Sequence, residues 1–188
     1  MTDHSLGYGV IYEPESFAGF FRRFIIISVD LSIVIALFYF GLELDSYFYV
    51  EYDDYYEDYS TYTMILIIYL YLTVIKSSKL GTFGLLLTGT KIVTLKGQKP
   101  NIFKMTFRFL FLLLGPINGI IDFLWLTMNP EKRTFRDCIC GTYIIRKNAS
   151  PIGEGPIHLS RVGLMGQMFL YPSVFKNENS SSNGPKVD

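Results

Sequence analysis

Residues Gly19 to Leu42 read GFFRRFIIISVDLSIVIALFYFGL, and this stretch decides the fold that the sequence predicts. Its central part, Phe24 to Gly41, holds eighteen residues with a single formal charge, Asp30. A helix of this length and composition is what a hydrocarbon layer of about 30 Å requires. We therefore expect a membrane-spanning helix that begins near Phe17. An unpaired carboxylate inside such a span costs about 2.5–3.5 kcal/mol, so Asp30 is expected to face protein or water rather than lipid.

The charges around this block predict how the chain is threaded through the membrane. Two arginines, the second of them Arg23, stand at the entrance of the first helix, and the positive-inside rule then places residues 1–16 in the cytosol. Residues 43–62 carry seven acids, seven tyrosines and no base, so we expect an acidic external loop over about 43–61. The apolar block Tyr62–Ile75 would return across the bilayer, since lysines follow it directly.

The third apolar block, Phe109–Met128, allows two interpretations. It is long enough for a single span. It is also interrupted at Gly115-Pro116 and at Asn118-Gly119, residue pairs that break helices and favour turns. A helical hairpin is favoured because it leaves the basic residues on both sides of the block in the cytosol.

Two short segments on either side of this block resemble each other. Thr90–Leu95 is alternating and β-branched, and Gly141–Lys147 has the same character; a lone strand is unstable, so we expect the two to pair. The predicted fold is an all-α polytopic membrane protein with two spanning helices, a Gly/Pro-broken helical hairpin and a possible short cytosolic β pair. Its membrane domain would cover residues 17–147. Residues 148–188, rich in Gly, Pro, Ser and Asn, would form a largely disordered tail.

The composition excludes several classes of function. The formal net charge is zero, whereas a nucleic-acid-binding protein normally has a basic excess. Cys138 and Cys140 are the only cysteines, and His4 and His158 the only histidines, so neither a disulfide framework nor a zinc cluster is expected. No nucleophile elbow, ligand set or acid/base pair occurs at a recognisable spacing. We therefore expect no enzyme, no metal and no cofactor.

Three segments carry a family resemblance. The opening AGFFRRF, residues 18–24, has an aspartate seven residues after its second arginine; GTFGLLLTGTKIV covers residues 81–93; and RTFRDCICGTYII covers residues 133–145. Together they resemble the RDD family of small polytopic membrane proteins, which is named for one arginine and two aspartates. The resemblance places the family's arginine on Arg23 and its aspartates on Asp30 and Asp137.

This resemblance implies a fold more firmly than a function. Members of the family look like candidate transporters, with sodium or proton exchange proposed for some, and eukaryotic relatives look like accessory subunits of membrane quality-control complexes. We expect an integral protein of a bacterial inner (plasma) membrane that contacts the lipid bilayer and forms a homo-oligomer or a subunit of a membrane complex. The expected function is cation or proton transport through intramembrane carboxylates; the alternative is a non-catalytic accessory or scaffold subunit.

The motif charges need partners from other segments. Seven residues are nearly two helical turns, so Arg23 and Asp30 share a helix face but stand about 10 Å apart along the axis. Asp137 is expected at the depth of Arg23, where a guanidinium–carboxylate contact suits a half-buried site. Arg133 and Arg136 are rivals of Arg23 for that carboxylate.

Asp30 lies deeper, and its candidate partners are Arg108, Asn118, Asp122 and the threonines of residues 81–93. Asp30 beside Asp122 would allow the two carboxylates to share a proton or bind a cation, the chemistry of a proton-coupled exchanger. Separate pairing of each aspartate with a cation would instead fix the helices relative to one another. The choice between these arrangements separates the transporter from the scaffold.

A group of basic residues follows the second apolar block without any acid among them. Arg108 has a long enough side chain to reach the inner membrane surface. With Lys96, Lys99 and Lys104, it is a candidate for binding lipid phosphate.

Overall fold

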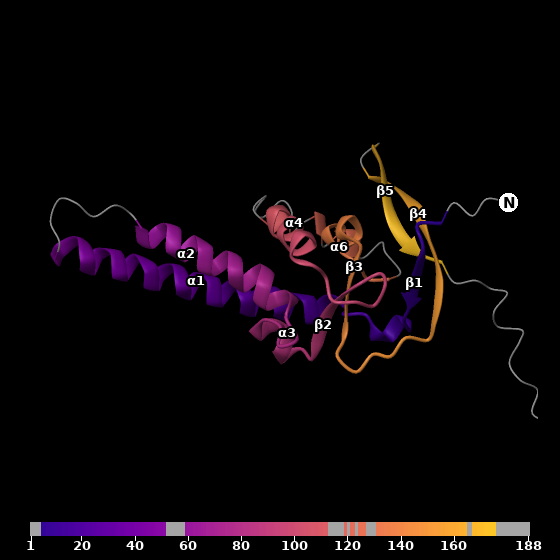
Figure 1. Ribbon diagram of the computed structural model, residues 1–188, viewed down its shortest axis with the longest axis horizontal. Coiled ribbons are helices and arrows are strands. Elements are labelled where there is room, and N and C mark those ends of the chain that lie inside the picture. The colour runs from indigo at the N-terminus through magenta and orange to yellow at the C-terminus, as the bar shows by residue number, and fades with distance from the viewer. Residues whose placement is uncertain are drawn as a thin grey trace, which may run out of the picture.

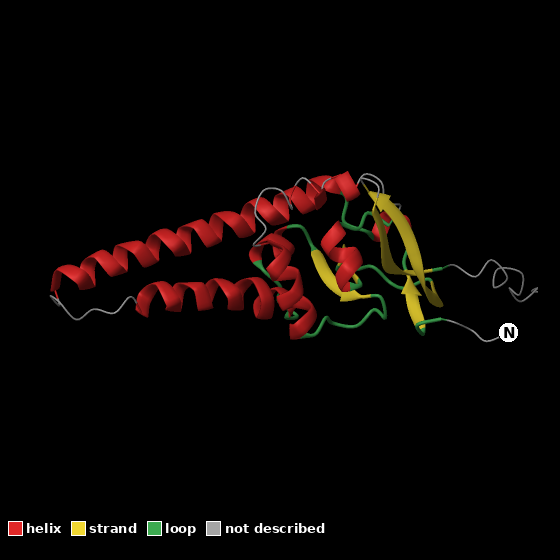
Figure 2. Cartoon of the chain, turned by 90° about the horizontal axis from the view of Figure 1, so that it is seen from above, coloured by secondary structure: helices red, strands yellow, loops and turns green. Residues whose placement is uncertain are grey.

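The computed structural model describes residues 5–51, 59–112, 119, 121–122, 124–126, 131–164 and 167–175. The molecule is elongated, with a pair of helices that projects from a body of short helices and two small sheets (Figure 1). Seen from above, the strands lie at the opposite end of the molecule from the tip of the helical pair (Figure 2). The motif residues lie where the pair meets the body.

Helix α1 (Phe20–Glu51) is the long axis of the molecule. Its 32 residues extend about 48 Å at 1.5 Å per residue, more than the hydrocarbon layer requires. Within the described residues, Phe20–Tyr47 is the one helical stretch that is long and apolar enough to cross a membrane, and only 17% of its most apolar part is buried. A core helix of a soluble protein would be mostly buried, so this exposure favours a membrane environment.

Helix α2 (Tyr59–Leu70) lies beside α1 and continues into a short π-helix, η2 (Tyr71–Ile75). The two helices approach closely at Gly41, where a Cβ would come within 2.5 Å of the Met64 side chain. The apolar helical stretch Thr61–Ile75 is shorter than a full span. The sequence predicted two spanning helices, whereas one of the described helices meets the length required.

The expected β pair is confirmed. Strand β2 (Thr90–Thr94) pairs antiparallel with β3 (Thr142–Arg146), with Thr90 opposite Arg146. Both faces of this two-stranded sheet are covered. On one side lies an apolar cluster made of Tyr12, Phe17, Val93, Leu95, Tyr143, Ile145 and Ile157, and on the other a cluster made of Ala18, Ile26, Leu85, Ile92, Met105 and Ile144.

A second sheet is formed by the two ends of the described chain. Strand β1 (Tyr8–Ile11) pairs antiparallel with β4 (Gly153–Leu164), which pairs antiparallel with β5 (Gln167–Val174). A 3-10 turn, η1 (Pro14–Ser16), leads from β1 toward α1. The sequence predicted a largely disordered tail after residue 148, whereas residues 153–164 and 167–174 form these strands. Their Gly- and Pro-containing segments are held because β1 supplies a partner edge and Ile157 enters the apolar cluster.

Three short helices connect the helical pair to the sheets. Helix α3 (Phe83–Leu87) packs against α1 and precedes β2; α4 (Ile102–Leu112) packs against η2 and α6; and α6 (Phe135–Cys140) leads directly into β3. Helix α4 is amphipathic, since it buries Met105 and Arg108 but exposes Phe103 and Phe107.

The prediction of an all-α protein is therefore wrong, because five strands in two sheets accompany the helices of the described residues. In β1, β4 and β5 the period-two apolar pattern is interrupted by glycine or proline, which masked these three strands in the sequence. The predicted hairpin within Phe109–Met128 has its Gly115-Pro116 break, and Asn118, outside the described residues.

Candidate functional site

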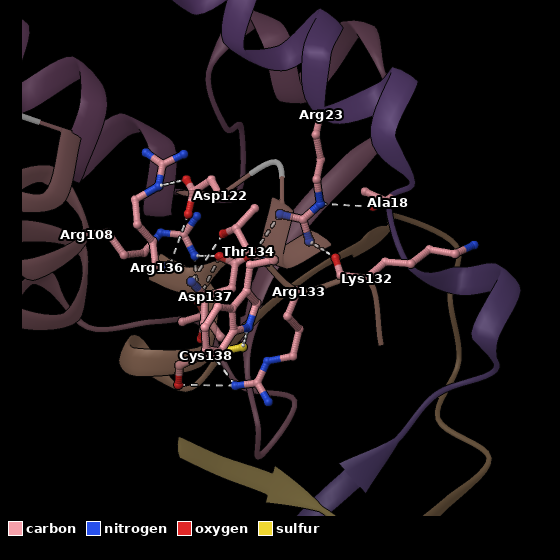
Figure 3. Close-up of polar contacts among 12 residues, drawn as sticks. Ala18, Arg23, Arg108, Asp122, Lys132, Arg133, Thr134, Arg136, Asp137 and Cys138 are labelled. Atoms are coloured by element: carbon pink, nitrogen blue, oxygen red, sulfur yellow. Dashed lines mark hydrogen bonds and ion pairs between the residues drawn. The ribbon is translucent and has the colours of Figure 1, made fainter. Parts of the chain in front are cut away.

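Asp137 connects four elements of the fold. Its side chain is fully buried, and Arg23 of α1 donates from Nη1 to Oδ2 at 2.5 Å. Arg108 of α4 donates from Nη1 to the other carboxylate oxygen, Oδ1, and also to Thr142 Oγ1 of β3 at 2.5 Å. The sequence-predicted contact of Arg23 with Asp137 is present, and Arg108 is the second cation on the same carboxylate (Figure 3).

The local sequence explains why this carboxylate is in place. Thr134 is the N-cap of α6, and Asp137 is the third residue of the helix, so the two form a capping box in which each side chain faces the other's backbone N–H. Gly141 then adopts the left-handed conformation, φ 59°, that ends α6 and turns the chain into β3. The segment TFRDCICG is thus a self-contained helix with a defined start and stop.

The electrostatics of Asp137 follow from its two arginines. Burial alone would raise the pKa of the carboxyl, but the guanidinium groups of Arg108 and Arg23 outweigh it and hold the pKa of Asp137 well below its usual range. The carboxylate is therefore ionised at neutral pH. The three groups together carry one net positive charge inside the protein.

All three nitrogens of the Arg23 guanidinium group make contacts that hold the start of α1 in place. In addition to the ion pair, Nε donates to the carbonyl of Ala18 at 3.0 Å and Nη2 donates to the carbonyl of Lys132 at 2.6 Å (Figure 3). A lysine could not make this set of contacts, because its charge is a single point without the planar fork of donors.

Asp30 forms a second hub, on α1 and seven residues after Arg23. Its carboxylate accepts from Lys76 Nζ at 2.6 Å, Thr82 Oγ1 at 2.9 Å, the Gly84 backbone N–H at 3.1 Å and the Tyr71 hydroxyl at 3.2 Å. These donors come from the two ends of η2, Tyr71 and the C-cap Lys76, and from the start of α3. The cost of burying Asp30 is offset by one cation and three further hydrogen bonds.

The glycine of this hub permits the close crossing of two helices. A Cβ at Gly84 would lie 2.6 Å from the carbonyl oxygen of Ile26 and 2.9 Å from Asp30 Oδ1. Helix α3 therefore touches the backbone of α1, and Thr82 and the Gly84 N–H reach the carboxylate only because no side chain intervenes. This is the physical role of the Gly/Thr-rich segment 81–93.

Asp122 belongs to a separate contact. Arg136 donates to it from Nε at 2.5 Å and from its backbone N–H at 3.3 Å. In the part of the chain that the structure describes, Asp30 and Asp122 have neither a hydrogen bond nor a cation in common. Arg108, one of the candidates for Asp30, contacts Asp137 instead. The predicted shared carboxylate site is not formed.

Arg133 has a structural role that the sequence analysis missed. Its side chain is buried; Nη2 donates to the carbonyls of Asp137 and Cys138 at the end of α6, and Nη1 donates to the carbonyl of Pro172 in β5 at 2.9 Å. Its guanidinium carbon also lies 5.0 Å from the ring centroid of Tyr143. Arg133 therefore ties the second sheet to α6. Only its place in the motif RTFRD marked it in the sequence, where it was considered as a rival for the Asp137 carboxylate.

Both cysteines are buried thiols on α6. Trp125 Nε1 donates to Cys138 Sγ at 3.2 Å, and burial raises the pKa of Cys138 to about 11. A thiol with such a pKa is a poor nucleophile at neutral pH. Within the described ranges, no three His, Cys, Asp or Glu side chains are grouped so as to hold a metal ion.

Lys96, Lys99 and Lys104 lie apart from the two hubs. They line a cavity of about 490 Å³ between the β2–α4 connection and the second sheet. Arg108, which the sequence grouped with them, points instead to Asp137.

Comparison with known proteins gives one family. The sequence model described as the RDD family matches residues 17–141. No curated protein and no solved structure matches the chain significantly. The match covers both carboxylate hubs and ends at the glycine that closes α6.

Proposed function

The chain belongs to the RDD family, and from this premise we propose that it is a non-catalytic scaffold subunit of a membrane complex, in which the α1–α2 pair anchors the mixed α/β body at the membrane surface. One observation carries the proposal. Each aspartate of the motif is occupied by hydrogen-bond donors from several segments, so the motif acts as a set of joints between the anchor and the body.

The contacts of the two hubs support a joining role. Asp137 links α1 to α4, α6 and β3, and Asp30 links α1 to η2 and α3. Removing one partner of a buried ion pair typically costs about 3–5 kcal/mol, because the other charge is left uncompensated. A carboxylate held by a buried ion pair of this kind therefore does not readily exchange its partner.

The arrangement of charges favours the scaffold over transport. A carboxylate that carries a proton or a cation across a membrane must exchange its partner during each cycle. Lys76 already neutralises Asp30, and Arg136 neutralises Asp122. The transport interpretation needs the two carboxylates at one site, and each has its own cation instead.

The proposal includes an orientation. Arg22 and Arg23 stand in the first turn of α1, at the end of the helix that meets the body, whereas Glu43 and Asp45 stand toward its far end. By the positive-inside rule, the body and the amino end would be cytosolic in a bacterial inner membrane.

The test compares flux, stability and association for one substitution. The wild-type chain, Asp30→Asn and the control Glu154→Gln, which changes an exposed carboxylate on β4, would be reconstituted in proteoliposomes and assayed for cation flux driven by a pH gradient. The scaffold predicts no flux above protein-free vesicles for any of the three. It also predicts a lower unfolding temperature for Asp30→Asn alone.

Association provides the positive readout. Purification of the full chain from membranes under mild detergent should also recover a second membrane protein, in a fixed stoichiometric ratio to this chain. Asp30→Asn should reduce the amount of that partner per chain, and Glu154→Gln should leave it unchanged. A pH-driven flux in the wild type that Asp30→Asn abolishes without a change in unfolding temperature would overturn the scaffold in favour of a transporter.

A further inference from the structure

A cavity of about 490 Å³ lies in the body, outside both hubs. Its wall is formed by the β2–α4 connection, residues 94–101, together with Lys104, the end of α6 at residues 139–141, and single residues of the amino-terminal segment, β4 and β5. A volume of this size is typical of sites for small molecules.

The lining of the cavity carries only positive charge. Lys96, Lys99 and Lys104 contribute to it, and no acid does. Their ammonium groups make neither a hydrogen bond nor an ion pair with the described part of the chain. Lys104 is half-buried, and its Nζ lies only 3.7 Å from the point where a Cβ of Gly141 would stand, so it reaches the cavity wall. Lys96 and Lys99 are exposed, and an anion in the cavity would be attracted by all three side chains.

The amino-terminal end of α4 adds to the positive charge of the cavity. Asn101, which lines the cavity, precedes α4, and its Oδ1 accepts the backbone N–H of Lys104 at 3.0 Å. The first turn of an α-helix has backbone N–H groups without intrahelical partners and the positive end of the helix dipole. Thr94 and Gln98 supply further polar groups to the lining.

We propose that this cavity binds a phosphate group, carried by the headgroup of an anionic lipid or by a soluble phosphate compound. Several lysines converging near a helix start match the charge and the acceptor oxygens of phosphate. Helix α4, whose first turn carries Lys104, exposes Phe103 and Phe107, and these apolar side chains would suit the acyl chain of a lipid whose headgroup enters the cavity. The inference does not depend on the scaffold function.

The test uses two variants of equal charge. Lys96→Gln/Lys99→Gln/Lys104→Gln removes the three charges of the cavity, and Lys79→Gln/Lys91→Gln/Lys147→Gln removes three lysines that do not line it. In neutral detergent, inorganic phosphate would be titrated by isothermal calorimetry. In nanodiscs of phosphatidylcholine with one fifth phosphatidic acid, retained lipid would be counted by native mass spectrometry.

Wild type and control are expected to bind in at least one arm, and the cavity variant to bind at least tenfold more weakly in that arm. Binding of phosphate alone identifies a soluble ligand, and retention of phosphatidic acid identifies a lipid. Equal binding by the two triple variants, or no binding in either arm, would overturn the proposal.

A second variant separates binding from folding. Asn101→Asp keeps an N-cap residue at the start of α4 but adds a negative charge to the cavity while all three lysines remain. It should weaken phosphate binding several-fold with no loss of thermal stability. Unchanged affinity in this variant would also contradict the proposal.

Discussion

Replacing Asp137 with asparagine should destabilise the protein more than any surface change. The substitution keeps the shape of the side chain but leaves Arg23 and Arg108 buried without their anion. Breaking a buried pair in this way costs about 3–5 kcal/mol, equivalent to a roughly hundredfold to few-thousandfold change in the folded-to-unfolded ratio. Since two cations lose one anion, we expect the upper part of this range.

The assay is denaturant-induced unfolding in mixed micelles, followed by tryptophan fluorescence. Trp125 is the single tryptophan of the chain and packs against Phe135 and Cys138 of α6, so its emission reports on the helix that carries Asp137. Glu154→Gln is the matched control, because it neutralises an exposed carboxylate and should change stability by less than about 0.5 kcal/mol. A loss below about 1 kcal/mol in Asp137→Asn would refute the assignment of Asp137 as a structural hub.

The same variant gives a pH dependence with a defined sign. The pKa of Asp137 is held well below its usual range in the folded protein, whereas the unfolded chain has the ordinary value near 4. The unfolded state therefore takes up a proton first as the pH falls. The stability that Asp137 contributes is fully present above about pH 5 and decreases below about pH 4, so the difference between wild type and Asp137→Asn should shrink in acid. A difference that stays constant from pH 7 to pH 3 would contradict the depressed pKa.

Three further predictions test the other contacts. Gly84→Ala should cost about 1–3 kcal/mol by overpacking against α1, whereas Gly19→Ala, where a Cβ meets nothing within 4 Å, should cost far less in the same unfolding assay. A double-mutant cycle of Asp30→Asn and Lys76→Met should give a coupling energy of about 1–3 kcal/mol, and a value near zero would remove this pair from the hub. Arg133→Lys should lower hydrogen-exchange protection in β5 more than in α2, and uniform protection would contradict the tie to the second sheet.

The contacts that the sequence predicted are those set by local spacing and by family motif. The interval of seven residues between Arg23 and Asp30 places both on one face of α1, and the turn after α6 defines where β3 begins. The pairing of β2 with β3 followed from two similar segments that each lacked a partner. The contact of Arg23 with Asp137 followed from their expected common depth.

The contacts that were missed depend on the path of the backbone. Lys76 was interpreted as a marker of the membrane boundary, but it directly follows η2 in helical conformation and its side chain contacts Asp30. Arg108 was assigned to lipid, whereas the amphipathic α4 presents it inward to Asp137. Strand β4 went unrecognised because its glycines and proline obscure the alternating pattern, and because one of its two partners, β1, lies 140 or more residues away in sequence.

The two hubs have different mechanical consequences, although Arg23, which contacts the first, and Asp30, which forms the second, share one face of α1. Asp30 holds α3, and through it the start of β2, against the inner part of α1. Arg23 holds α6 and α4 through Asp137, and α6 leads into β3. Because β2 and β3 pair with each other, each hub positions one strand of the same sheet, and α1 sets the distance between them. The motif of one arginine and two aspartates therefore attaches this sheet to α1 at two places. Loss of the contacts at either place should leave the body attached to α1 only through the other.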